Sequence, residues 1–126
     1  MKKEATRKSH YVKPFSRRRV LIPFERSFSA EEFERVKLGV VPEWDDHWFI
    51  FLEGRRRQYI YFVRSWTGFC AYVVRVEEKN NIARITKPWA SCQFGKPDVK
   101  EAAEILSMVI ENVLLNPEAC DPVMPL

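Results

Sequence analysis

Three runs of aromatic and β-branched residues, separated by two short breaks that each contain glycine, constrain the fold of this chain most. The runs span residues 44–52, 58–64 and 69–76, and the breaks contain Gly54 and Gly68. Such runs, with turn residues between them, are typical of antiparallel strands that follow one another in a meander. Both faces of these strands are apolar, so we expect the sheet to be covered at least partly on both sides.

Alternation along the strands assigns their side chains to two faces. In chain order, Trp48, Ile50 and Leu52 lie opposite His47, Phe49 and Phe51; Ile60 and Phe62 lie opposite Tyr59, Tyr61 and Val63; and Ala71 and Val73 lie opposite Tyr72, Val74 and Val76. A fourth, shorter strand is predicted over residues 82–86, after a polar turn. We expect residues 87–97, with two prolines, to form a loop that lies on the body of the protein.

Helices are predicted on both sides of the meander. The first has Ser29 as its N-cap, Glu32 completing a capping box and Gly39 as its C-terminal stop. The second is capped by Asp98, carries an apolar stripe at helical spacing and ends at Asn116. Residues 17–24 are a candidate short strand. Their proline lacks an N–H donor, which restricts this strand to an edge of the sheet. The predicted fold is α+β: a four-stranded antiparallel meander with an N-terminal and a C-terminal helix, in a two-layer sandwich.

The charge is distributed unevenly along the chain. Residues 1–20 carry eight Lys or Arg and one Glu, whereas the remainder carries 13 basic and 16 acidic residues. We therefore predict a disordered basic tail over residues 1–19, one α+β domain over residues 20–116, and a loose C-terminal tail over residues 117–126. The basic tail could contact nucleic-acid phosphates through Arg17, Arg18 and Arg19, or it could serve only as a solubilising tail.

The three cysteines are Cys70, Cys92 and Cys120, and no pair has C-x-x-C spacing. An odd number of separated cysteines favours reduced thiols and a cytoplasmic location. No apolar stretch is long enough for a membrane span, and no secretory signal precedes the domain. No phosphate-binding, dinucleotide or metalloprotease motif is present, and the sequence Asp45-Asp46-His47 has no second cluster to complete a metal site. We therefore expect no metal and no cofactor.

Turn positions bring a group of polar and aromatic residues to one end of the predicted sheet. Turns centred near residues 54–55, 66–67 and 79–80 place Asp45 opposite Arg64, and Arg64 opposite Cys70. The candidate ligand- or partner-binding residues at this end are Asp45, Asp46, Arg64, Ser65, Trp66, Thr67, Gly68, Lys87 and Trp89, with Thr86 beside them.

Each part of this group has a structural and a functional interpretation. Trp66 either folds back over the sheet edge or stacks on a flat ligand while Arg64 holds an anionic group. The pair Asp45 and Asp46 either forms an ion pair and a strand cap or supplies a general base. Three tyrosines of the predicted strands could stack nucleic-acid bases, but we favour a face covered by a helix: Tyr59, Tyr61 and Tyr72.

The stretch from Tyr61 to Tyr72, which includes Arg64-Ser65-Trp66-Thr67-Gly68, together with Asp45-Asp46-His47-Trp48-Phe49-Ile50, resembles a group of small bacterial proteins of unknown function. The resemblance covers roughly residues 20–76. It implies a bacterial host and supports residues 64–68 as a motif, but it implies no activity. The chain has Val63 where the group has His, which weakens an enzymatic interpretation.

Three functional hypotheses follow. The leading one is a small cytoplasmic, non-enzymatic binding module that meets a protein or a small anionic ligand at the end formed by Asp45, Asp46 and residues 64–68. The second is a small hydrolase or nucleotide-acting enzyme with Asp45 or Asp46 as the base and Arg64 stabilising anionic charge. The third is nucleic-acid binding through the basic tail.

Overall fold

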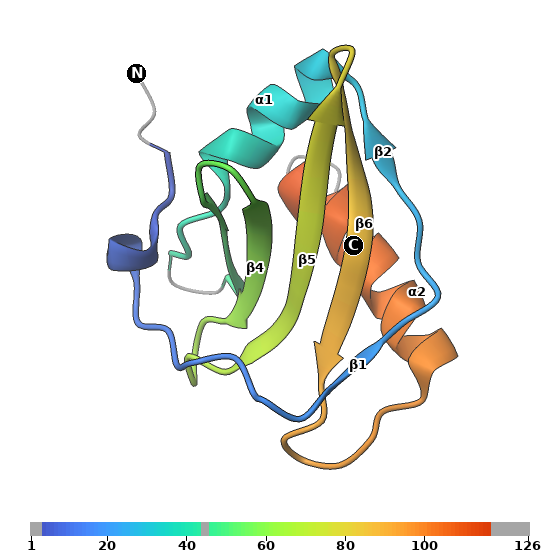
Figure 1. The fold of residues 1–126 in the computed structure, drawn as a ribbon. Helices are drawn as coiled ribbons and strands as arrows, with labels where there is room; N and C mark the ends of the chain where they lie inside the picture. Colours follow the sequence, from blue (N-terminus) through green and yellow to red (C-terminus); the bar gives the residue numbers. More distant parts are fainter. Residues whose placement is uncertain (1–3, 44–45, 117–126) are drawn as a thin grey trace, which may run out of the picture.

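The computed structural model describes residues 4–43 and 46–116. Its six strands pair in antiparallel fashion, in the order β1-β6-β5-β4-β3, and β2 also pairs with β6 (Figure 1). The strands are β1 (Arg19–Leu21), β2 (Ser27–Phe28), β3 (Trp48–Glu53), β4 (Gln58–Arg64), β5 (Cys70–Lys79) and β6 (Ile82–Ser91). The helices are η1 (Arg7–Ser9), α1 (Ala30–Leu38) and α2 (Val99–Val109), and α2 continues into a π turn, η2 (Ile110–Leu114). The predicted α+β class is confirmed, whereas the predicted number of strands, four, is wrong.

The additional strands arise because the chain before α1 runs along the free edge of β6. Leu21 pairs with Trp89 in β1, and Ser27 pairs with Arg84 in β2. The pairing is interrupted between them, where Pro23 lacks an N–H group and the Phe24 N–H bonds to the Ile22 carbonyl at 2.9 Å. This arrangement covers an edge that would otherwise expose unpaired backbone groups.

Strand β6 is ten residues long and includes part of the stretch that we predicted to be a loop. The prediction failed because Pro88 was read as a strand breaker. In the structure the Pro88 carbonyl faces the edge and accepts a hydrogen bond from Ile22 N at 3.0 Å. The missing N–H of Pro88 therefore weakens only the edge pairing, at the point where β1 ends.

Both helices pack on the same face of the sheet. The predicted capping box of α1 is confirmed: Ser29 Oγ accepts from Glu32 N at 3.1 Å, and Gly39 follows the helix with φ of +66°. In α2, Asp98 Oδ1 accepts from the N–H groups of Lys100 and Glu101. The main hydrophobic core lies between the helices and the sheet and contains, among others, Phe28, Phe33, Val36, Ile50, Ile60, Phe62, Val74, Leu106 and Ile110.

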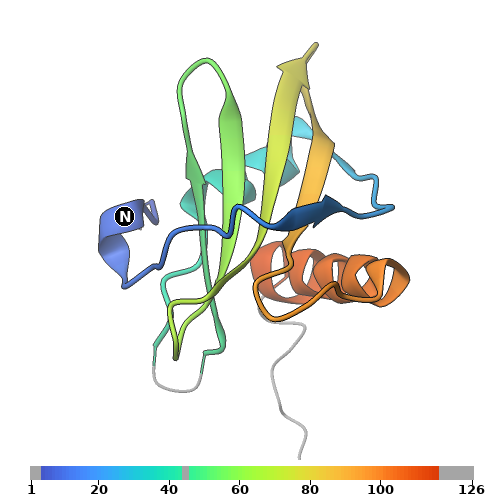
Figure 2. The same cartoon turned by 60° about the horizontal axis from the view of Figure 1, so that its bottom comes forward.

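A second, smaller core lies on the opposite face, as the two-sided apolar pattern predicted. It contains Phe49, Phe51, Val63, Cys70 and Val73, and it also contains Ala5 from the N-terminal segment. Val12 and Phe15 pack against it. Figure 2 shows η1 and α2 on opposite sides of the sheet.

The N-terminal segment differs from the disordered tail that we predicted. Ala5 is only 2% exposed, and its N–H donates to the Leu38 carbonyl at 2.8 Å. Arg7 bonds both oxygens of Glu53 at 2.9 Å, which holds η1 on the sheet. The segment is ordered because a few scattered apolar residues are buried. Their spacing has the period of neither a helix nor a strand, so the sequence pattern did not reveal them. The predicted C-terminal tail, residues 117–126, lies outside the described residues.

Two β-bulges change the predicted side-chain assignment. Between β4 and β5 the pairing shifts, because Phe62 faces Tyr72 and Val63 faces Cys70, so Ala71 is the extra residue. Ala71 therefore packs with the helix-side core together with Tyr72, and not opposite to it as the alternation predicted. Between β5 and β6 the corresponding extra residue is Thr86.

Candidate functional site

The turn that joins β4 to β5 is fixed by its own backbone. Arg64 N donates to the Phe69 carbonyl, and Gly68 N donates to the Arg64 carbonyl, both at 2.8 Å. Gly68 adopts φ of +76°, a conformation that costs a non-glycine residue strain. Thr67 Oγ1 accepts from Phe69 N at 3.1 Å. The turn is thus closed by hydrogen bonds within residues 64–69.

Two neighbouring segments hold this turn in place. On the β3 side, Ser65 N donates to the His47 carbonyl at 3.0 Å, and Ser65 Oγ donates to the Asp46 carbonyl at 2.6 Å. Ser65 is 7% exposed, which explains why a small hydroxyl residue stands there. On the other side, Lys13 N donates to the Gly68 carbonyl at 2.8 Å. The N-terminal segment is therefore part of the site.

Trp66 projects into solvent from the tip of this turn. Its side chain is 73% exposed, and its one ring contact in the described structure is with His47, at 5.4 Å between centroids. Of the two interpretations of Trp66, folding back over the core is therefore excluded. The structure holds a large aromatic residue in water on a rigid support.

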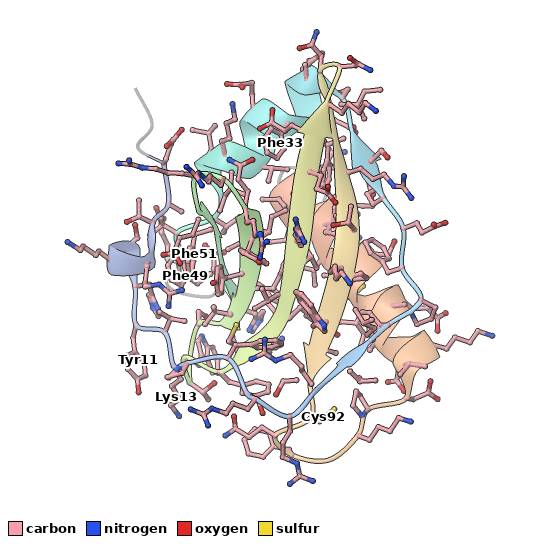
Figure 3. All side chains as sticks on the ribbon, viewed as in Figure 1. Tyr11, Lys13, Phe33, Phe49, Phe51 and Cys92 are labelled. Carbon is pink, nitrogen blue, oxygen red and sulfur yellow. The ribbon has the colours of Figure 1, made fainter. Side chains whose placement is uncertain are left out.

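Two further exposed aromatic residues, Tyr11 and Phe94, pack against Gly68 and Phe69 beside Trp66 in the sequence. Tyr11 is 62% exposed and packs on Gly68, where a Cβ would lie only 2.6 Å from the ring. Phe94, in the loop after β6, is 81% exposed and contacts Phe69 at 5.1 Å between ring centroids. Figure 3 shows Tyr11, Lys13 and Cys92 along the same end of the molecule. We call Tyr11, Trp66, Phe69 and Phe94 the aromatic rim.

The rim residues outside residues 64–68 could not be found by counting residues across the predicted hairpins. Tyr11 stands in a basic stretch that we took for a tail, and Phe94 stands in a loop that we expected to lie on the body. Phe94 beside Gly95 was the available signal, since an aromatic residue at a loop tip must either pack or stay exposed.

Arg64 stands opposite Trp48, not opposite Asp45. Its guanidinium carbon lies 4.8 Å from the centroid of the Trp48 ring, a cation–π contact. The predicted register was wrong by three residues because five residues, Gly54 to Gln58, separate the last pair of β3 and β4, which is Glu53 with Tyr59. The predicted position of Arg64 opposite Cys70 was wrong by one residue, because Val63 occupies it.

The two aspartates of the predicted site have different outcomes. Asp45 lies outside the described residues. Asp46 Oδ2 accepts from Glu43 N at 2.9 Å, and its carbonyl accepts from Ser65 Oγ. Asp46 therefore connects Glu43 to Ser65 in the β4–β5 turn.

Lys87 and Trp89 are not brought to this end. Lys87 pairs with Arg75, which in turn pairs with Tyr59, near the loop that joins β3 to β4. Trp89 pairs with Val73 on one side and Leu21 on the other, within the sheet. Thr86, in the bulge, is farther still from the turn. The bulge and the greater length of β6 place these residues elsewhere.

Among residues 4–43 and 46–116, no group of three or more His, Cys, Asp or Glu side chains is placed to hold a metal ion. Of the described cysteines, Cys70 is buried and free, and burial raises its pKa to about 12. Cys92 is free and partly exposed. No helix in the described part of the chain is long and apolar enough to cross a membrane.

The fold and this site define a small α+β protein that presents a fixed turn with an exposed aromatic rim. Comparison with protein-family models, with curated proteins and with solved structures gave no match.

Proposed function

We propose that this chain is a non-enzymatic binding module whose partner is a protein that docks on the aromatic rim and on the adjoining residues Asp46 and 64–68. The observation that carries the proposal is the 73% exposure of Trp66 on a turn fixed by its own hydrogen bonds and by those of two neighbouring segments. An exposed tryptophan is costly to solvate, and binding hot spots are enriched in tryptophan and tyrosine.

The rigidity of the turn supports a binding role. Ser65 is held by the backbone of residues 46 and 47, and Gly68 is held by Lys13. A partner that accepts the indole would therefore not have to order the turn, so less binding free energy is lost. The rim is also accompanied by exposed cations, including Lys13, Arg64 and Lys96. A partner with an apolar pocket bordered by carboxylates would complement this surface.

The test compares Trp66→Ala with Ile82→Ala in affinity capture from the native host. Ile82 is 50% exposed and lies beside the β5–β6 turn, and in the β5–β6 pairing it is as far from the Trp66 turn as a strand residue can be. We expect proteins that are retained by the wild type and by Ile82→Ala to be lost with Trp66→Ala. Trp66→Ala should retain the thermal stability of the wild type, because the indole has few contacts. Partners that bind both variants equally would contradict the proposal.

The enzyme hypothesis has a separate test. A thermal-shift screen against nucleotides, sugar phosphates and divalent ions would be run on the wild type and on Arg64→Ala. A ligand at about 100 times its dissociation constant stabilises the folded state by about 2.7 kcal/mol. A shift that disappears in Arg64→Ala would replace the protein-binding proposal with a small-molecule site. No shift is expected, since the Asp46 carboxylate already accepts a hydrogen bond from Glu43 N.

A further inference from the structure

The face of the sheet opposite α1 and α2 is only half covered. The N-terminal segment covers Phe49, Phe51 and Val63 on β3 and β4. Figure 1 shows the segment with η1 beside β3 and β4, at the left of the view, while β5 and β6 carry no helix on the side that faces the viewer. The register places six side chains on this face beyond that cover, of which Lys87, Leu21 and Arg84 are exposed and the others partly exposed. We call them the open face: Tyr59, Arg75, Lys87, Trp89, Leu21 and Arg84.

The placement of two tyrosines on this side corrects our expectation that they line a helix-covered face. Tyr72 packs in the helix-side core, whereas Tyr59 and Tyr61 pack against the smaller core on the other face. The guanidinium of Arg7 lies 4.8 Å from the centroid of the Tyr61 ring and covers it. Tyr59 is therefore the partly exposed tyrosine that remains available beside the open strands.

The open face is rich in cations that lack carboxylate partners. Arg75 and Lys87 are paired neighbours across β5 and β6, and Arg84 lies on the same face. Among the described residues none of the three forms an ion pair, although Glu77 faces Arg84 across the strands. The Nε of Arg75 is moreover buried and has no hydrogen-bond partner in the described structure.

Aromatic side chains border these cations on both sides. Tyr59 pairs with Arg75 from β4, and Trp89 stands two residues beyond Lys87 on β6. Neighbouring strands are about 4.8 Å apart, so the Arg75–Lys87 pair lies within one or two strand spacings of both aromatic rings. Alternating cationic and aromatic groups on an open sheet match a ligand polymer whose charged backbone and flat rings are both exposed.

We propose that the open face binds single-stranded nucleic acid. Arg75, Lys87 and Arg84 contact phosphates, while bases stack on Tyr59 and Trp89. A duplex hides its base faces, so it can use only the cations and binds more weakly. The proposal is independent of the aromatic rim, since the rim lies at an end of the sheet and the open face lies on its surface.

The experiment measures fluorescence anisotropy of labelled 12-nucleotide single strands, RNA and DNA, against the full-length chain. Lys87→Gln removes an exposed charge on the open face, and Lys100→Gln removes an exposed charge on α2 as the matched control. We expect Lys87→Gln to weaken binding severalfold and to reduce the slope of log K against log salt by about 0.7, the value for one phosphate contact on a single strand. Lys100→Gln should bind like the wild type. Tyr59→Leu should weaken binding without changing the salt slope.

Three outcomes would overturn the proposal. The first is absence of binding at low salt, and the second is equal binding of Lys87→Gln and Lys100→Gln. The third is a loss confined to an Arg17→Gln, Arg18→Gln double variant, which would assign binding to the basic segment before β1. The double variant is preferable to deletion of residues 1–19, since that deletion would remove Ala5 from the smaller core and Arg19 from β1.

Discussion

Replacement of Phe49 by Ala is expected to lower the free energy of unfolding by about 3–5 kcal/mol, the usual cost of removing a buried phenylalanine. Phe49 lies on the face that neither α1 nor α2 covers, yet it is 0% exposed. Its ring contacts His10 at 5.4 Å and Phe51 at 5.0 Å between centroids. Figure 3 shows both phenylalanines beside the N-terminal segment. The predicted cost therefore depends on a segment that the sequence pattern did not identify as structured.

Urea denaturation measures this cost. With a denaturant slope of about 1–3 kcal/mol/M, a loss of 3–5 kcal/mol moves the midpoint down by at least about 1 M. Phe62→Ala, in the helix-side core, should cost about as much, because Phe62 is also 0% exposed. Tyr59→Ala, on the same face as Phe49 but partly exposed, should cost about 1 kcal/mol or less. If Phe49→Ala cost no more than Tyr59→Ala, the N-terminal segment would not cover the sheet in solution.

Three further predictions concern stability. Gly39→Ala should destabilise the fold by more than Gly95→Ala, because both glycines have positive φ but a Cβ at Gly39 would lie 2.3 Å from the Ile50 carbonyl oxygen, whereas none of the described atoms lies within 4 Å at Gly95; thermal denaturation of the two variants tests the order. Ser29→Ala should cost about 1 kcal/mol, since it removes the N-cap of α1, and equal melting temperatures would contradict the cap. Burial raises the pKa of the Cys70 thiol to about 12 from 9.0, so the protonated form is favoured in the folded state and stability should fall as pH rises from about 9 toward 12, by at most about 1.4 kcal/mol per pH unit; Cys70→Ala should lose this part of the pH dependence.

The faces of the first two main strands could be predicted because burial follows strict alternation. Trp48 and Ile50 pack with the helices and Phe49 and Phe51 with the smaller core, as the sequence indicated. Alternation fails at Ala71, since a bulge adds one residue and the period of two is broken. Nothing in a single sequence marks such a position, because its residue type fits either face.

The turn formed by residues 64–68 could be predicted from the sequence more closely than the residues that lie next to it in the sheet. Residues 64–68 form the turn between β4 and β5, as predicted, whereas the sequence left open whether Trp66 folds back over the sheet, and the structure shows it exposed. Their expected neighbours depended on counting from the β3–β4 turn, and a five-residue connection displaced that count by three. Arg64 pairs with Trp48, and its guanidinium makes a cation–π contact with the Trp48 ring. Register depends on turn length, which three consecutive arginines after Gly54 do not determine.

The half-open face is compatible with a stable fold because of the residues that line it. Under the N-terminal segment the sheet carries Phe49 and Phe51, which require a cover. Outside it the sheet carries Lys87, which is exposed and whose methylene stem covers the strand while its charged end reaches water. Lys87→Gln keeps most of that stem and loses only the charge, so its stability should equal that of the wild type. Any loss of nucleic-acid binding in this variant can then be attributed to the missing charge and not to a disturbed sheet.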